Sequence, residues 1–314
     1  ATANVICLLG GEVVFADVDP VTGLMTPQSL RDALARAQSS VRAVLPVHLG
    51  GRLADMPAIG AIAREAGAAV IEDACHALGA AHADGEGRMV PTGACAHSDA
   101  AVFSFHPVKT ITAGEGGAIA CRTPELAARL RRLRSHGMER SPAAWSERDL
   151  SFEDGEPNPW YYEMPELGWN YRLPDLQCAL AHSQLAKLDR FLARRGMLAD
   201  AYDRLLAPLS NLIKPAPRIS GQQSGWHLYQ VSIDFEGARR SRGAVMRALH
   251  ARGIGTQVHY IPLNRQPYYS RRGAPDLPGA ERFYAATLSL PFYPAMEVAD
   301  VERVVQALAE TVAA

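Results

Sequence analysis

Residues 41–72 read VRAVLPVHLGGRLADMPAIGAIAREAGAAVIE, and this stretch decides the fold class. Its two ends, residues 41–48 and 69–72, are short runs of branched apolar residues, which are typical of buried strands. Residues 55–66 between them start with a capping aspartate and a first-turn proline, and Gly67 follows, so they predict a helix. A strand, a helix and a second strand in this order predict an α/β fold with an at least partly parallel sheet.

The same reading extends along the rest of the chain. We expect strands at 100–105 and 117–121, a helix at 124–133, a long loop at 138–168 and a helical stretch at about 175–206. After a linker near 214–224, we expect a strand at 226–235, a helix at 242–251, a strand at 256–261 and helices near 280–287 and 298–312. We therefore predict a large domain over residues 1–208 and a small C-terminal α/β domain over residues 209–314.

Composition excludes several classes of protein. The 314 residues are 48% hydrophobic and 21% charged, which is ordinary for a globular chain. A net charge of −1 provides no basic field for nucleic acid, and no apolar run is long enough to span a membrane. Five cysteines without a Cys-x-x-Cys pair argue against a disulfide framework or a zinc ribbon and favour the reducing cytoplasm. The chain begins without Met, inside what reads as a structural element, so we expect its native N-terminal part to be missing.

Lysine is scarce, and one lysine stands out. The chain has 32 basic residues, of which only Lys109, Lys187 and Lys214 are lysines. Lys109 lies in the segment FSFHPVKTITAGEGGAI, residues 103–119, just after a predicted buried strand. Ligands of α/β sheets bind beyond the carboxyl ends of strands, and desolvation makes a lysine amine nucleophilic toward carbonyls. Lys109 is therefore a candidate for Schiff-base chemistry, with a surface lysine on a turn as the alternative.

A second candidate site follows the strand in AAVIEDACHALGA, residues 68–80. Glu72 and Asp73 end an apolar strand, and a buried unpaired carboxylate is costly, so at least one must meet a cation or reach water. The alternative is an ordinary aspartate cap on a following helix. Cys75 and His76 add potential metal ligands, but the mixed residue types fit no zinc pattern, and we expect no metal.

Other motifs are less specific. Asn170 and Arg172 precede a long helix and could hold a phosphate, or they could form a solvated turn. The glycine-rich residues 112–118 fit neither a P-loop nor a dinucleotide-binding fingerprint. Several aromatic residues could line a sugar pocket or simply pack the small domain: His227, His259, Tyr260, Tyr268 and Tyr269.

Taken together, these stretches resemble the DegT/DnrJ family of sugar-nucleotide aminotransferases. The matching segments are VIEDACHALGA, FSFHPVKTITAGEGGAI, SHGM, LGWNYRLPDLQCALAHSQL and RGIGTQVHYIP, in the order of the family. The resemblance implies the fold of the type I transferases that use pyridoxal 5′-phosphate (PLP), with a mainly parallel central sheet and a small C-terminal α/β domain. It also implies a homodimeric enzyme with PLP as cofactor.

The resemblance assigns roles to individual residues. Lys109 corresponds to the Schiff-base lysine, which a dehydratase branch of the fold replaces by His. Asp73 corresponds to the carboxylate facing the pyridine nitrogen of PLP, which keeps the ring protonated as an electron sink. His76 corresponds to the residue beside the cofactor ring. Ser104 corresponds to a phosphate ligand.

The resemblance also implies a shared active site. Asn170 corresponds to a phosphate ligand that reaches across from the neighbouring subunit, and Arg172 lies on the same loop. Family members begin further upstream, with a small-residue loop for the cofactor phosphate and an aromatic residue that stacks on the ring. Both lie before the equivalent of Ala1.

Within the family, PWYYE at 159–163 and HYIPLNRQPYY at 259–269 resemble the branch that acts in pseudaminic acid biosynthesis. This branch implies a UDP-linked 4-keto-6-deoxy sugar as amino acceptor and glutamate as amino donor, with His259, Tyr260 and Tyr268 as candidate substrate contacts. The alternatives are an aminotransferase for another nucleotide keto sugar and a PLP-binding regulatory protein without catalysis.

Overall fold

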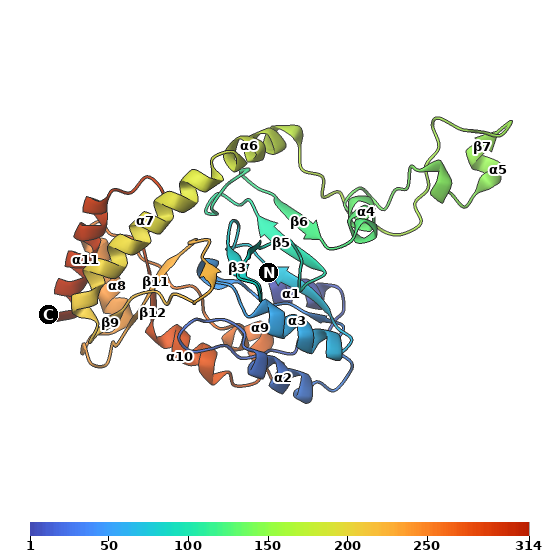
Figure 1. The fold of residues 1–314 in the computed structure, drawn as a ribbon. Coiled ribbons are helices and arrows are strands. Elements are labelled where there is room, and N and C mark those ends of the chain that lie inside the picture. The colour runs from blue at the N-terminus through green and yellow to red at the C-terminus, as the bar shows by residue number, and fades with distance from the viewer. Residues whose placement is uncertain (314) are drawn as a thin grey trace.

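The computed structural model describes residues 1–313, which form a mixed α/β fold in two parts (Figure 1). The larger part is built on a four-stranded sheet in the order β1-β2-β5-β6. Its strands are β1 (Ala43–Val44), β2 (Ala69–Asp73), β5 (Ala100–Ser104) and β6 (Gly117–Cys121). β1, β2 and β5 run parallel, whereas β6 pairs antiparallel with β5. The predicted partly parallel sheet is therefore confirmed, although the strand expected at 41–48 is regular only over two residues.

Four helices accompany this sheet; the second and third of them pack into its buried core, whereas the fourth has no buried residue. They are α1 (Thr2–Leu8), α2 (Pro27–Arg36), α3 (Met56–Glu65) and α4 (Pro124–Leu133). The predicted start of α3 is confirmed, because the Asp55 carboxylate accepts from the Ala58 N–H at 3.2 Å. Gly67 follows the helix with a φ of +67°. Ile59 and Ile62 of α3 are buried against Val44 and Val70 of the sheet.

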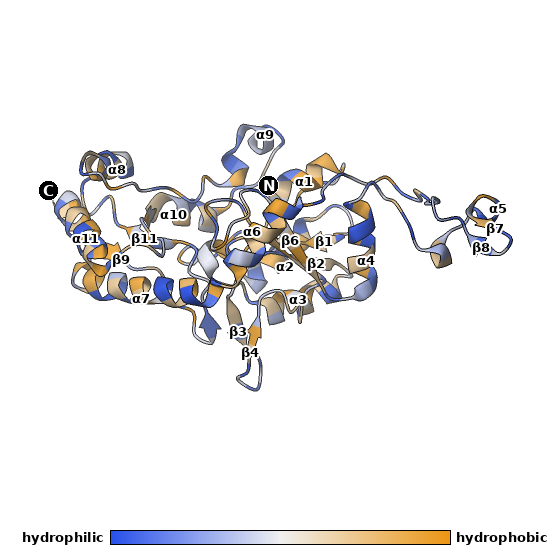
Figure 2. Cartoon of the chain, turned by 90° about the horizontal axis from the view of Figure 1, so that it is seen from above, coloured by the Kyte–Doolittle hydropathy of each residue, from blue (hydrophilic) through white to orange (hydrophobic). Residues whose placement is uncertain are grey.

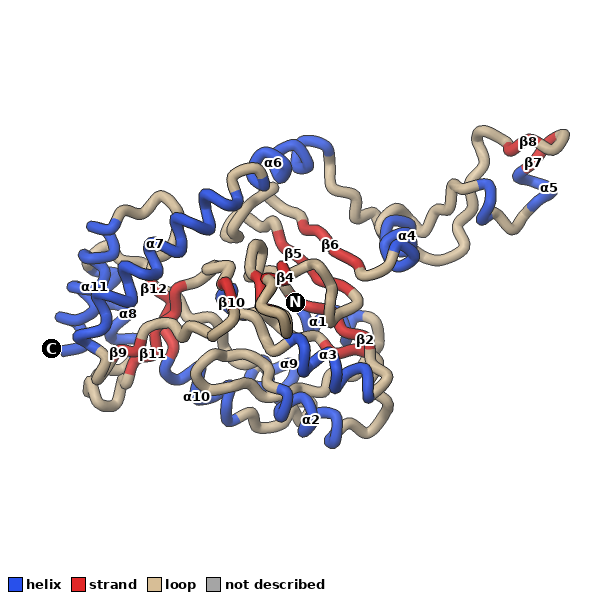
Figure 3. Tube along the Cα trace, in the orientation of Figure 1, coloured by secondary structure: helices blue, strands red, loops and turns tan. Residues whose placement is uncertain are grey.

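The C-terminal part is a second, antiparallel sheet wrapped by helices (Figure 3). Its strands, in the order β12-β11-β9, are β9 (Ile213–Lys214), β11 (Tyr229–Ile233) and β12 (Thr287–Leu290). Its helices are α7 (Leu188–Leu206), α8 (Arg242–Ala251), α10 (Pro278–Ala286) and α11 (Val298–Ala313), and shorter helical pieces are η3 (Ala207–Leu209), η4 (Leu263–Arg265) and α9 (Pro267–Ser270). One core joins α7, β11, α8 and α11, with Tyr202, Tyr229, Leu249 and Leu308 fully buried.

One sequence expectation was wrong, and two others are refined by the structure. The strand expected at 256–261 is absent from the described chain, where Gln257 only bridges Ser289, and β11 pairs with β12 instead. The linker near 214–224 contributes a strand at each end. At its start, β9 joins the C-terminal sheet. At its end, β10 (Gln222–Gln223) pairs with β3 (Ala81–Ala83), which forms a hairpin with β4 (Met89–Pro91). The helical stretch at 175–206 is two helices, α6 (Asp175–Leu185) and α7. They separate where an exposed helix gives way to one that packs into the core.

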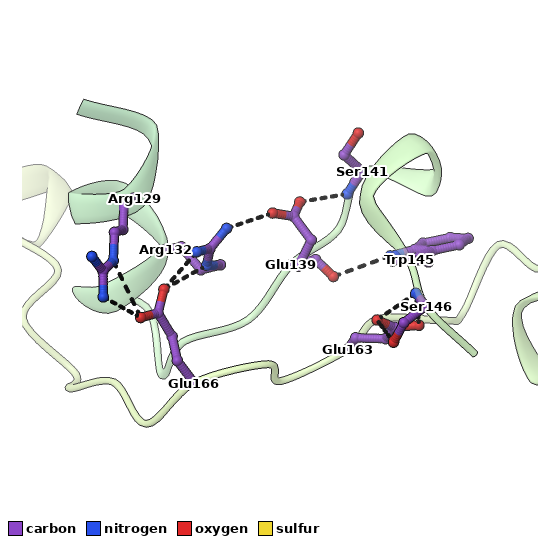
Figure 4. A network of polar contacts seen from close by, with 8 residues as sticks. All are labelled: Arg129, Arg132, Glu139, Ser141, Trp145, Ser146, Glu163 and Glu166. Atoms are coloured by element: carbon purple, nitrogen blue, oxygen red, sulfur yellow. Dashed lines mark hydrogen bonds and ion pairs between the residues drawn. The ribbon is translucent and has the colours of Figure 1, made fainter. Parts of the chain in front are cut away.

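Residues 138–168 form an arm that projects away from both parts of the molecule (Figures 1 and 2). It carries only short elements: η2 (Pro142–Ala144), α5 (Arg148–Ser151), β7 (Phe152–Glu153) and β8 (Glu156–Pro157). Ion pairs hold its root to α4 (Figure 4). There Arg129 and Arg132 both donate to Glu166, and Arg132 also donates to Glu139 at 3.1 Å.

A short turn joins the two parts through main-chain hydrogen bonds. The turn, η1 (Leu49–Gly51), offers the Gly50 carbonyl to the N–H groups of His227 and Leu228 at 3.1 and 3.2 Å. Gly51 has a φ of +98°, and a Cβ there would lie 2.5 Å from the Trp226 nitrogen. Only glycine fits this approach. No helix within the described chain is both long and apolar enough to cross a membrane.

Candidate active site

Lys109 lies on the loop that follows β5, where its N–H donates to the His106 carbonyl at 2.9 Å. Its side chain is half-buried. Burial lowers the pKa of Lys109, and the nearby Cys75 and Asp73 oppose this shift only in part. Within residues 1–313, no hydrogen bond or ion pair engages the amine, so Lys109 is available to react with a ligand.

Asp73 ends β2 on the same side of the sheet. Its carboxylate accepts a hydrogen bond from the Thr2 hydroxyl and another from the Cys75 N–H at 3.2 Å. Burial favours the neutral acid, but these hydrogen bonds prevail and hold the pKa of Asp73 below its usual range. Asp73 is therefore ionised near Lys109. Residues 74–79 form turns, so the alternative of an aspartate cap on a following helix does not apply, and the aspartate caps a turn instead.

Cys75 lies close to both Asp73 and Lys109. Burial and the Asp73 carboxylate raise the pKa of its thiol to about 12, so the thiol stays protonated. Its Sγ lies 3.8 Å from the Val102 carbonyl. A buried neutral thiol is inert, so the Lys109 amine is the more reactive of these two groups.

Two neutral histidines form the wall beside Lys109 and Asp73. The rings of His76 and His227 are 4.3 Å apart between centroids, and both residues are buried. Burial, helped by the Lys109 charge, lowers the pKa of His76 to about 3 and depresses that of His227 further. The Gly50 N–H donates to His76 Nδ1 at 3.3 Å, whereas the buried Nδ1 of His227 has no partner within residues 1–313.

The C-terminal part adds two of the three expected substrate contacts to this site. His259 Nδ1 lies 2.8 Å from the Ser289 hydroxyl, and burial together with the Lys109 charge lowers the pKa of His259. The ring of Tyr260 is 6.3 Å from that of His76, and its side chain is exposed. Tyr268 is not brought to this place; it lines a separate hollow with Cys7, Phe15 and Arg272.

The residues expected to bind phosphate are divided between two places. Ser104 ends β5, where its hydroxyl accepts from the His106 N–H at 3.3 Å, close to Lys109 along the chain. Asn170 and Arg172 are exposed, and Asn170 forms a bridge with Ser135 beyond α4. Neither contacts the cluster of Lys109, Asp73 and His76 within the same chain.

Sequence reasoning missed two residues that shape this site. Thr2 reaches Asp73 across 71 positions, and no local pattern signals such a contact. Arg195 of α7 is buried, and its Nη1 donates to the carbonyls of Trp226 and His227 at 3.1 and 3.2 Å. An arginine on the packed side of an otherwise apolar helix stripe is the signal that could have identified it.

The side chains present fit PLP. A reactive amine without a partner, an ionised carboxylate and neutral imidazoles suit an aldehyde-bearing ring whose nitrogen carries a proton. A carboxylate accepts about four hydrogen bonds, so Asp73 retains acceptor capacity beside Thr2 and Cys75. Within the described residues, no group of three or more His, Cys, Asp or Glu side chains could hold a metal ion.

Comparison with known proteins gives consistent matches over the chain. The model of the DegT/DnrJ/EryC1/StrS aminotransferase family matches residues 1–309. The spore coat polysaccharide biosynthesis protein SpsC of Bacillus subtilis (strain 168) is 37% identical over 316 residues, covering 99% of this chain and 76% of SpsC.

Solved structures of aminotransferases have the same architecture. Helicobacter pylori PseC, described as an aminotransferase involved in the biosynthesis of pseudoaminic acid, matches with a TM-score of 0.85 and 26% identity, over 99% of this chain and 76% of PseC. The aminotransferase TlmJ of Streptoalloteichus hindustanus matches with a TM-score of 0.82 and 30% identity, over 99% of this chain and 76% of TlmJ.

Proposed function

The chain belongs to the DegT/DnrJ/EryC1/StrS aminotransferase family, and we propose that it transfers an amino group from glutamate to the 4-keto carbon of a nucleotide-linked 6-deoxy sugar. As a member of this family it is a PLP-dependent sugar aminotransferase. The amino donor, the exact sugar, the residue roles and the assembly are the proposed parts.

The observation that carries the proposal is the environment of Lys109. Its amine is half-buried, lacks a hydrogen-bonding partner within residues 1–313 and has a lowered pKa next to the ionised Asp73. Lys109 would hold PLP covalently, Asp73 would face the ring nitrogen, His76 would lie beside the ring, and Ser104 would bind the phosphate. When bound, PLP supplies an electron sink for the negative charge that develops on the amino-bearing carbon.

Lys109 also provides the acid–base chemistry. Because burial lowers its pKa, a larger fraction of its amine is unprotonated at neutral pH than for an exposed lysine. Lys109 accepts the proton from the α-carbon of glutamate and, in the second half-reaction, delivers a proton to C4 of the sugar. Asp73 stays ionised throughout, and the neutral His76 and His227 add no competing positive charge.

For the sugar we propose the UDP-linked 4-keto-6-deoxy substrate of the pseudaminic acid pathway, whose product is UDP-4-amino-4,6-dideoxy-N-acetyl-β-L-altrosamine. The structural match to PseC and the aromatic residues His259 and Tyr260 near His76 support this choice. The higher identity to SpsC favours another nucleotide keto sugar as the second candidate. Turnover of a panel of nucleotide 4-keto and 3-keto sugars distinguishes the two.

We also propose that two copies share each active site. Asn170 and Arg172 lie away from Lys109 of their own chain, and the neighbouring Trp160, Leu167 and Leu176 are largely exposed. A second copy that covered this surface would place Asn170 at the partner's cofactor phosphate. We place the enzyme in the cytoplasm, in keeping with five cysteines that form no disulfide.

The visible absorption spectrum tests Lys109. Wild-type protein with added PLP should develop a band of the lysine-bound cofactor that glutamate bleaches, and Lys109→Ala should show neither effect. Lys187→Ala, which removes another of the three lysines, is the matched control and should behave as wild type. A Lys109→Ala chain that transaminates at the wild-type rate would exclude the assignment.

Mixing two inactive variants tests the shared site. Folded Lys109→Ala and Asn170→Ala chains each lack one half of the site, so mixed dimers should recover part of the activity. Absence of recovery, with subunit exchange demonstrated by mass spectrometry of differently labelled chains, would contradict the proposal.

A further inference from the structure

A second carboxylate lies next to Asp73, on the buried side of β2. Glu72 is 6% exposed, and its Oε2 lies 2.8 Å from Nε2 of the fully buried His48. Its other oxygen accepts a hydrogen bond from the hydroxyl of Ser98, which is also buried. No Lys or Arg forms an ion pair with Glu72 within residues 1–313. This is an unusual arrangement, because a buried carboxylate is normally paired with a cation.

The hydrogen bonds of His48 define its protonation. The Ala54 N–H can only donate, and it points to His48 Nδ1 at 3.2 Å, so Nδ1 carries no proton. Nε2 therefore carries the proton and donates it to Glu72. Burial disfavours the Glu72 anion, but the hydrogen bonds from His48 and Ser98 hold its pKa below the usual range. The pair is a neutral histidine and an anionic glutamate.

His48 also contacts Asp73 directly through the main chain. The His48 N–H donates to the Asp73 carbonyl at 3.1 Å, and the Asp73 N–H donates to the Pro46 carbonyl at 2.9 Å. One residue thus holds Asp73 by its backbone and Glu72 by its ring. Because successive side chains of a strand point to opposite faces, fixing Glu72 on the buried face fixes the direction of Asp73 on the other.

We infer that His48 and Glu72 are a positioning pair that fixes the Asp73 carboxylate for the ring nitrogen of the cofactor. The inference rests on the role proposed above for Asp73. Two apolar side chains would fill the same space without the cost of desolvating an anion, so packing alone does not explain the pair. A fixed carboxylate direction does explain it, because polar partners behind a site orient the groups that act in it.

Substitutions separate geometry from charge. Glu72→Gln keeps both hydrogen bonds, since the amide oxygen can accept from His48 and the amide N–H can donate to the Ser98 hydroxyl; only the charge is lost. Glu72→Leu removes both hydrogen bonds, and His48→Phe removes the ring's hydrogen bond to Glu72. Ile59→Val, in the core between α3 and the sheet, is the control for a loss of packing that touches neither Glu72 nor Asp73.

The first measurement needs no cofactor. Hydrogen–deuterium exchange of the peptide covering residues 69–75 should be about tenfold faster in Glu72→Leu and His48→Phe than in wild type, because the end of β2 loosens. Glu72→Gln and Ile59→Val should exchange within about threefold of wild type in this peptide. Should either apolar variant fail to fold, Ser98→Ala, which removes one hydrogen bond from Glu72, should show the same loosening to a smaller degree.

The second measurement uses the PLP-loaded enzyme. Glu72→Leu and His48→Phe should lower kcat by about 10- to 100-fold, with a change in KM for glutamate of less than about threefold. Glu72→Gln should retain nearly wild-type kcat. Equal damage from Glu72→Gln and Glu72→Leu would overturn the inference, because the charge would then act rather than the geometry. Wild-type exchange and kcat in the apolar variants would overturn it as well.

Asp73→Asn distinguishes failure of this inference from failure of the proposed function. If Asp73→Asn keeps wild-type turnover, the role proposed for Asp73 is wrong, and the inference about His48 and Glu72 fails with it. If Asp73→Asn is inactive while the apolar variants of His48 and Glu72 behave as wild type, only the positioning inference is wrong.

Discussion

Lowering the pH from 7 to 5 should destabilise the cofactor-free protein through His76 and His227. Both histidines are held neutral by burial, with the pKa of His76 lowered to about 3 and that of His227 depressed further. In the unfolded chain an imidazole has a pKa of about 6.5. The unfolded chain therefore binds protons below pH 6.5 that the folded chain does not bind, and stability falls as the pH falls.

The magnitude follows from the difference in bound protons. Below pH 6.5 each such histidine costs about 1.4 kcal/mol of unfolding free energy per pH unit, until the pH reaches the pKa of the folded state. Between pH 7 and pH 5 this amounts to about 2 kcal/mol per histidine and about 4 kcal/mol for the two. This stability is fully present above pH 6.5 and is lost toward pH 3.

Urea unfolding at the two pH values, followed by far-UV circular dichroism, measures the effect. His76→Gln cannot titrate, and its amide oxygen can still accept from the Gly50 N–H, so its loss of stability between pH 7 and 5 should be about 2 kcal/mol smaller than that of wild type. His250→Gln, which changes an exposed histidine on α8, should show the wild-type loss. An undiminished loss in His76→Gln would refute the argument that this ring is neutral in the folded state.

Three further outcomes are expected. Gly51→Ala should lower the free energy of unfolding by at least about 2 kcal/mol in urea titrations, because its φ of +98° strains an alanine and the new Cβ would lie 2.5 Å from the Trp226 nitrogen. Gly67→Ala is the control: its Cβ meets open space, so it should cost only about 1 kcal/mol. Arg195→Met should cost about 3 kcal/mol in the same assay, because the carbonyls of Trp226, His227 and Phe292 lose a charged donor. Glu166→Gln should speed tryptic cleavage within the arm without changing the midpoint of thermal unfolding, since it weakens only the ion pairs at the arm's root.

Much of the fold could be predicted from the sequence because its signals are local. The aspartate cap, the first-turn proline and Gly67 define α3 within two residues of its observed ends. β2, β5 and β6 are short apolar runs that lie where the pattern indicates. The segment 256–261 had the composition of a strand, but it meets β12 only through Gln257 and Ser289, and the length of such a pairing depends on contacts more than 30 positions away.

In the candidate site, too, the residues with a local sequence signal could be predicted and the long-range contacts could not. Lys109 and Asp73 stand out locally, as a rare lysine and as a carboxylate ending an apolar strand, and the structure places them together. Thr2, near the N-terminus, donates to Asp73 across 71 positions, and His48 contacts Glu72 across 24 positions. Neither contact has a local signal in the sequence. Asn170 was singled out as a possible phosphate ligand before a helix, and its role across the subunit boundary came from the resemblance; a single chain does not bring it to Lys109.

The turn between the two parts of the molecule has a consequence for how such enzymes diversify. Its hydrogen bonds run from main chain to main chain, between Gly50 or Gly51 and residues 225–228, and so they do not depend on which side chains surround them. A C-terminal part with a different sugar-facing surface can therefore be grafted onto the same lysine-bearing part if the few side-chain pairs across the joint, such as Arg52 and Gln230, are kept. Because α7 and β9 belong to the core and sheet of the C-terminal part, a chimaera should exchange residues 188–314 as one unit. Such chimaeras should fold where both parents keep the two glycines, which would combine a new substrate preference with unchanged chemistry.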